Sequence, residues 1–73
     1  MATMNDQSRD KIIQEFETMK SFELSAHDLY RQIARDPQVT DLKVKDTFKR
    51  LANDEQHHAD LVQEIIDMVR QTL

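Results

Sequence analysis

The sequence of 73 residues contains no glycine, no cysteine and a single proline. Without glycine, it has no loop of the kind that cradles phosphates or dinucleotides. Without cysteine, disulfides, thiolate zinc sites and iron–sulfur clusters are excluded. A net charge of -4 argues against nucleic-acid binding through a basic surface. No apolar run approaches the roughly 20 residues that cross a bilayer, so we expect one small cytoplasmic domain with no membrane partner.

The hydrophobic residues that are present recur at helical rather than strand spacing. Two stripes step alternately by four and three residues: Ile12, Phe16, Met19, Glu23, Ala26, Tyr30 and Ile33, then Val44, Phe48, Leu51, Glu55, His58, Val62, Ile65 and Val69. Pro37 interrupts the pattern, because proline disfavours helix at and before its own position. The pattern predicts an all-α fold with helices over about residues 9–35 and 41–71.

The ends of these helices carry capping side chains. Ser8 can cap the first helix, and Thr40 or Asp41 can cap the second. We therefore expect a frayed tail over residues 1–8 and a helical hairpin over residues 9–73. A short link between two long helices makes them antiparallel neighbours.

A lone hairpin buries one seam and leaves much of each wide apolar stripe in water. The simplest partner is a second copy, which would complete a four-helix bundle. The expected minimal unit is a homodimer, from which a higher ring can be built.

Three members of the stripes are polar: Glu23, Glu55 and His58. Glutamate is almost never buried unpaired, and neither stripe offers a Lys or Arg as a counter-ion. Glu55 and His58 are three residues apart, so they leave one face of the same helix. Glu23 precedes the middle of the turn by about 15 residues, and Glu55 and His58 follow it by about 17–20 residues. Because a helix rises about 1.5 Å per residue, the three side chains lie at similar heights along the hairpin.

Two carboxylates and an imidazole that converge at one height are side chains of the types that bind metal ions. Two copies supply four Glu and two His, the donor inventory of di-iron carboxylate bundles. Four carboxylate charges also balance two divalent cations. The expected cofactor is iron, two ions per dimer, with manganese, zinc or calcium as substitutes.

The same residues admit two interpretations other than a redox-active di-iron site. The ions could be structural, so that the chain is a metal-stabilised dimerisation or scaffold module without turnover. Alternatively, the glutamates could be protonated register residues of an ordinary self-associating hairpin. Redox turnover would separate a redox-active di-iron site from the structural module, and metal-dependent dimerisation would separate the structural module from the ordinary hairpin.

The three polar residues stand in longer motifs. Residues 23–30 (ELSAHDLY) place Ala three and Tyr seven residues after a Glu, and residues 51–59 (LANDEQHHA) contain an acidic-Glu-x-x-His-Ala run. Both resemble the ligand helices of the rubrerythrin branch of the ferritin-like superfamily, and Asp36-Pro37 resembles the turn before the second of them. The resemblance extends over about residues 12–66.

Rubrerythrins carry four bundle helices on one chain, and this sequence has two. In that respect it is similar to encapsulated ferritins, two-helix chains that build a di-iron site between subunits. The resemblance implies that Glu23, Glu55 and His58 bind iron at a ferroxidase site. Such a site oxidises Fe(II) to Fe(III) for storage or detoxification. It also implies an encapsulin shell as partner.

Three further side chains lie near the expected ligands. The resemblance and the stripe position of Tyr30 predict a catalytic role in which its hydroxyl donates to a ligand carboxylate of the partner hairpin. His27 follows Glu23 by one turn, and we expect it on the flank of the stripe. His57 is rotated about 100° from His58, which predicts a surface position.

Overall fold

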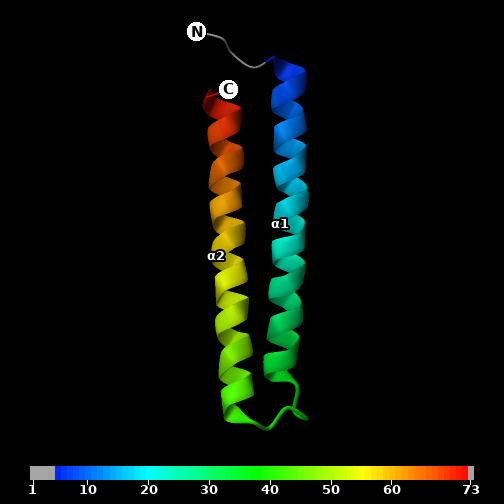
Figure 1. The fold of residues 1–73 in the computed structure, drawn as a ribbon, viewed down its shortest axis with the longest axis vertical. Coiled ribbons are helices and arrows are strands. Elements are labelled where there is room, and N and C mark those ends of the chain that lie inside the picture. The colour runs from blue at the N-terminus through cyan, green and yellow to red at the C-terminus, as the bar shows by residue number, and fades with distance from the viewer. Residues whose placement is uncertain (1–4, 73) are drawn as a thin grey trace.

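The computed structural model describes residues 5–72, which form two long helices. α1 spans Asp6–Arg35 and α2 spans Leu42–Thr72. The helices lie antiparallel and side by side, in a rod of 57 × 16 × 12 Å (Figure 1). The expected all-α helical hairpin is therefore confirmed. Neither helix, as far as residues 5–72 extend, is long and apolar enough to cross a membrane.

The first helix begins earlier than the sequence predicted. The Oδ1 of Asn5 accepts a hydrogen bond from the Ser8 N–H at 2.8 Å, and the Asn5 carbonyl accepts one from Arg9 at 3.0 Å. Asn5 is thus the N-cap, because its side chain satisfies a free N–H of the first turn. The Ser8 cap is wrong, and residues 6–8 are helical rather than part of a tail; residues 1–4 lie outside the described residues.

The turn between the helices is shaped by its proline. Asp36 ends α1 with an extended backbone (ψ 121°), the conformation that a following proline favours. The Asp36 Oδ1 accepts the N–H of Gln38 at 2.9 Å, and its carbonyl accepts the N–H of Val39 at 3.0 Å. These bonds satisfy backbone donors within the turn and direct the chain back along α1.

Asp41 caps the second helix. Its Oδ1 accepts the N–H of Val44 at 3.0 Å, and its carbonyl accepts that of Lys45 at 3.0 Å. Of the two capping residues that the sequence offered, the aspartate therefore performs the role. α2 begins at Leu42, one residue later than predicted.

The contact between the helices is made largely by small side chains. The buried residues of the described chain are Ala34, Ala52, Ala59, Val62 and Ile66. Alanines let the two backbones approach closely, but they bury little apolar area. A single hairpin therefore has a very small interior for its length.

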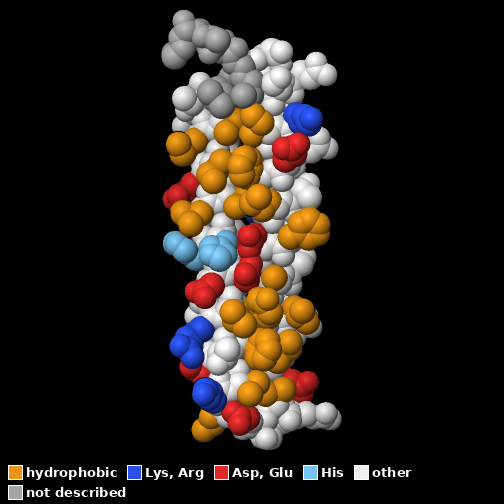
Figure 2. Space-filling model, in the orientation of Figure 1, with side chains coloured by type: hydrophobic (Ala, Val, Ile, Leu, Met, Phe, Trp, Pro, Cys, Tyr) orange, Lys and Arg blue, Asp and Glu red, His pale blue; other side chains and the backbone are white. Residues whose placement is uncertain are grey.

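Many of the larger hydrophobic side chains lie outside this contact. The exposed ones are Met19, Phe22, Leu29, Leu42, Val44, Leu51, Leu61, Ile65 and Met68. Figure 2 shows hydrophobic side chains in a band along one face of both helices, interrupted near mid-length by acidic and histidine side chains. We call this band the open apolar face.

Part of each predicted stripe lies on this face rather than in the contact between α1 and α2. Met19, Leu51 and Ile65 are stripe members that remain exposed, whereas Ala52 and Ile66, each one residue further on, are buried. One residue rotates a side chain by about 100° around a helix. Val62 of the second stripe is nevertheless buried, and Phe16 and Phe48 are half-buried, so the stripes extend from the contact between the helices to the open apolar face.

Replacing Asp41 by Ala should lower the free energy of unfolding by about 1 kcal/mol, because an N–H of the first turn of α2 loses its acceptor. Urea unfolding followed by circular dichroism measures the loss. Thr40→Ala is the matched control and should change little. Equal losses in the two variants would contradict the assignment of the cap.

Candidate metal centre

The structure brings Glu23, Glu55 and His58 together at mid-length of the hairpin. α1 contributes Glu23, and α2 contributes the other two from one face, since they lie three residues apart. One ligand atom from each residue lies within 4.8 Å of the others. Among residues 5–72 these three form the group of acidic and histidine side chains that can hold a metal ion.

The separations of the donor atoms suit a shared cation. His58 Nδ1 lies 3.7 Å from Glu23 Oε2 and 4.0 Å from Glu55 Oε1. Both distances are too long for hydrogen bonds. Two donors that each lie about 2.1 Å from one ion are at most about 4.2 Å apart. The two distances from His58 fall inside this limit and are therefore compatible with a shared ion.

The three side chains lie near mid-length of the hairpin, where acidic and histidine side chains interrupt the open apolar face (Figure 2). The side chains of Glu23 and Glu55 are 24% and 21% exposed, whereas that of His58 is 53% exposed. The carboxylates are thus partly shielded by the hairpin itself, and the imidazole stands at the surface. Anything that covers the open apolar face would enclose all three.

The two carboxyl groups perturb one another. A hydrogen bond with Glu23 is the main cause that raises the pKa of Glu55, and burial and the Glu23 charge raise it further. Asp54 adds to the effect, and His58 opposes it. Within residues 5–72, His58 is the only basic group within 4.0 Å of either glutamate. Glu55 therefore takes up a proton more readily than an isolated glutamate, at a place where a cation would stabilise its charged form.

Tyr30 lies away from this group within its own chain. Its ring packs against Phe48 with a centroid distance of 5.9 Å and an interplanar angle of 43°. Tyr30 is also seven residues from Glu23, or about 10 Å along the helix. Its predicted hydrogen bond to a carboxylate of a partner hairpin stays a prediction. The contact with Phe48 was not anticipated, although both residues are stripe members at similar distances from the turn.

The other two histidines stand outside the ligand group. His27 is mostly covered, with 13% of its side chain exposed, and its Nδ1 lies 3.1 Å from Asp28 Oδ1. His57 is exposed. Both positions agree with the expectation that His27 flanks the stripe and His57 lies on the surface.

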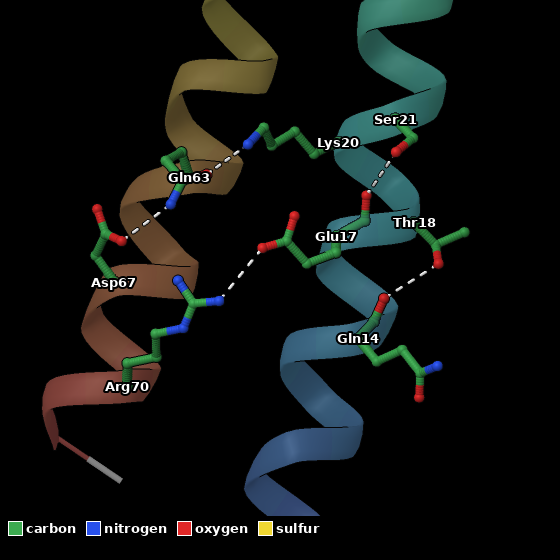
Figure 3. Close-up of polar contacts among 8 residues, drawn as sticks. All are labelled: Gln14, Glu17, Thr18, Lys20, Ser21, Gln63, Asp67 and Arg70. Carbon is green, nitrogen blue, oxygen red and sulfur yellow. Dashed lines mark hydrogen bonds and ion pairs between the residues drawn. The ribbon is translucent and has the colours of Figure 1, made fainter.

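Polar contacts between the helices fix the position of each helix along the axis of the other. Lys20 Nζ donates to Gln63 Oε1 at 2.6 Å, and Arg70 pairs with Glu17 at 3.5 Å (Figure 3). Gln63 also donates to Asp67 at 2.9 Å. Lys20 precedes Glu23 by three residues, so its bond to α2 helps to keep Glu23 opposite its partners. Nothing in the sequence pattern identified these pairs, because they join residues far apart along the chain.

Comparison with known proteins adds an independent observation. A family model described as Rubrerythrin matches residues 16–73, which include Glu23, Tyr30, Glu55 and His58. The chain belongs to the rubrerythrin family. No curated protein and no solved structure matches it.

Membership of the rubrerythrin family indicates a ferritin-like, iron-binding protein, and the residues of the site fit that metal. Carboxylate oxygens and an imidazole nitrogen are donors that suit Fe(II) and Mn(II). Ferritin-like di-iron sites take donors from four helices. This rubrerythrin-family hairpin offers three donor residues from two helices, which is half of that set.

Glu55→Gln should stabilise the metal-free protein at neutral pH. A raised pKa means that the folded chain holds a proton on Glu55 that the unfolded chain releases near 4.5. The free energy of unfolding therefore falls as the pH rises from about 4.5 through the raised pKa. Glutamine does not titrate, so the free energy of unfolding of the Glu55→Gln variant should not show this fall. Thermal melts with a chelator between about pH 4 and pH 8 measure it.

The exposed Glu64 supplies the control for this experiment, because it lies on the same helix outside the ligand group. Glu64→Gln should retain the fall in stability between low and neutral pH. An identical pH dependence in the two variants would contradict the coupling between Glu55 and Glu23.

Proposed function

We propose that two copies of this chain form a four-helix ferroxidase that binds two iron ions between them and oxidises Fe(II) to Fe(III). The observation that carries the proposal is the convergence of Glu23, Glu55 and His58 within 4.8 Å in a rubrerythrin-family hairpin. The role of iron as the substrate rests on the family and on the donor types. Storage or detoxification of the oxidised iron is the purpose that this activity would serve.

The need for a second copy follows from the surface and from the donor count. The open apolar face carries Phe22 at 72% exposure, together with Leu29 and Met68 at 53% and 63%. Exposed apolar area of this extent favours association. A second hairpin on this face brings another Glu23, Glu55 and His58 to the same height, which completes the four-carboxylate, two-histidine set.

The charges support the same stoichiometry. Two copies contribute two glutamates each, which gives four negative charges inside a newly covered interior. Several kcal/mol per ion oppose such burial unless the charges are compensated. Two divalent cations carry four positive charges and neutralise the set. We expect Glu23 and Glu55 to bind or bridge the ions and His58 to bind one ion per chain.

The redox step balances with dioxygen as the oxidant. Each Fe(II) loses one electron, and the two electrons together with two protons reduce one dioxygen to hydrogen peroxide. Hydrogen peroxide can serve instead, since two electrons and two protons convert it to two waters. Within this reaction the residues of the chain bind and orient the ions, and Tyr30 of a partner hairpin positions a carboxylate through its hydroxyl.

Two finer parts of the proposal concern assembly. Dimers of this kind can associate further into a ring, and an encapsulin shell is the destination for the iron that the resemblance implies. Both remain predictions that depend on contacts beyond a single hairpin.

Anaerobic loading with Fe(II), followed by admission of air, tests the activity. One iron per chain should bind, and a ferric absorbance band should then grow faster than for free iron in the same buffer. Glu55→Ala should slow oxidation by at least about 100-fold, since the loss of an indirect partner of a metal already costs 10–100-fold. Glu64→Ala is the matched control and should oxidise iron at the rate of the unmodified chain.

The remaining outcomes separate the alternatives. Tight iron binding and assembly without accelerated oxidation would replace the ferroxidase by a structural metal module. An absence of binding would reject the metal site and leave Glu23 and Glu55 as polar register residues of an ordinary bundle, an arrangement with which the raised pKa of Glu55 agrees.

Phe22→Glu should disrupt the dimer, because it places a charge on the apolar surface that a second copy must cover. Light scattering coupled to size-exclusion chromatography should show the mass falling toward that of one chain. Ser21→Glu adds the same charge one residue away, about 100° around the helix, and should leave the mass unchanged. A monomeric unmodified chain with iron bound would contradict the proposed assembly.

A further inference from the structure

A hollow lies between the halves of α1 and α2 that adjoin the turn. Its volume is about 400 Å³. Ala34 and Ala52, both buried, contribute to its lining, and their small side chains leave space between the helices. Arg31 and Arg35 line it from α1, one helical turn apart, and Lys49 lines it from α2. Three cationic side chains thus surround one concave site.

This arrangement contrasts with the rest of the hairpin. Nearer the chain ends, the contacts between helices match cation to acceptor: Arg70 to Glu17, and Lys20 to the Gln63 amide oxygen (Figure 3). At the hollow, two arginines of α1 stand across from a lysine of α2 in a chain whose net charge is -4. Like charges around a concave surface raise the free energy of the empty site and attract anions to it.

Two acids close to the hollow contact residues other than its three cations, and one of these contacts is to His27, which itself lines the hollow. Asp28 lies 3.1 Å from Nδ1 of His27, and Asp46 pairs with Arg50 at 3.2 Å. Within the part of the chain that the structure describes, Arg31, Arg35 and Lys49 form no ion pair. The cations of the hollow are therefore free to bind an anion from solution.

We propose that the hollow lined by Arg31, Arg35 and Lys49 binds a phosphate group. Guanidinium groups match two phosphate oxygens at once, and a lysine ammonium adds a compact positive charge. Asn53 and His27 also line the site and offer further nitrogen atoms for hydrogen bonds. No Phe, Tyr or Trp belongs to the lining, so nothing is present to stack on a nucleobase. The chemistry favours free phosphate over a nucleotide.

The site is separate from the proposed iron centre and from the open apolar face. None of Glu23, Glu55 and His58 lines it. Arg31 follows the exposed apolar Leu29 by two residues, which is about 200° around the helix. A second copy that covers the open apolar face therefore leaves the hollow accessible, and phosphate binding does not depend on the proposed oxidation of iron.

Titration of inorganic phosphate into the metal-free chain tests the site. Calorimetry and amide chemical shifts should be recorded with a chelator present and ionic strength held constant. We expect saturable binding of one phosphate per chain, with shifts at the residues of the hollow. Arg31→Gln and Lys49→Gln should each weaken binding about tenfold, as expected for loss of a charge-assisted hydrogen bond.

Arg50→Gln is the matched control, since Arg50 adjoins Lys49 in sequence but pairs with Asp46 and does not line the hollow. It removes the same charge and should change the affinity by less than about twofold. Equal weakening in all three variants would overturn the proposal by showing diffuse attraction, as would binding that never saturates.

A titration with AMP distinguishes the source of the phosphate group: affinity equal to that of phosphate assigns the site to the free ion, whereas affinity at least about tenfold higher assigns it to a nucleotide.

Discussion

The close contact of α1 and α2 through alanines is the constraint on which the rest of the structure depends. Ala34, Ala52 and Ala59 bring the helices together while burying little apolar area. Apart from Val62 and Ile66, which are buried, many of the larger hydrophobic side chains remain exposed, where only another surface can cover them. The same close approach places Glu23 within reach of Glu55 and His58, and small side chains leave the hollow beside the turn open.

The hairpin thereby separates charges of opposite sign. Carboxylates gather at mid-length, whereas Arg31 and Lys49 line a hollow nearer the turn that none of these carboxylates lines. Each group is costly without a counter-ion: the proximity of Glu23 raises the pKa of Glu55, and the cations are compensated by solvent or an anion. An iron-binding chain of the rubrerythrin family that also holds phosphate would bind ions of both signs at separate places.

Local rules account for most of the correct predictions. Pro37 marked the turn, the spacing of four and three residues marked both helices, and the i, i+3 relation of Glu55 and His58 placed them on one face. Predictions that depend on which of several residues close in sequence caps a helix were less accurate. Ser8 and Asn5 are both good caps, and the choice between them depends on which first turn packs better, as does the choice between Thr40 and Asp41.

The sequence by itself determined the helical class, the position of the turn and the common height of Glu23, Glu55 and His58, because helix rise and rotation are nearly constant along a chain. Only the tertiary structure decided which positions lie between the helices, that Tyr30 packs on Phe48, and that cations from two helices share one hollow. These features depend on the rotation of each helix about its own axis. Side-chain packing sets that rotation, and a one-residue shift in it moves a side chain by about 100°.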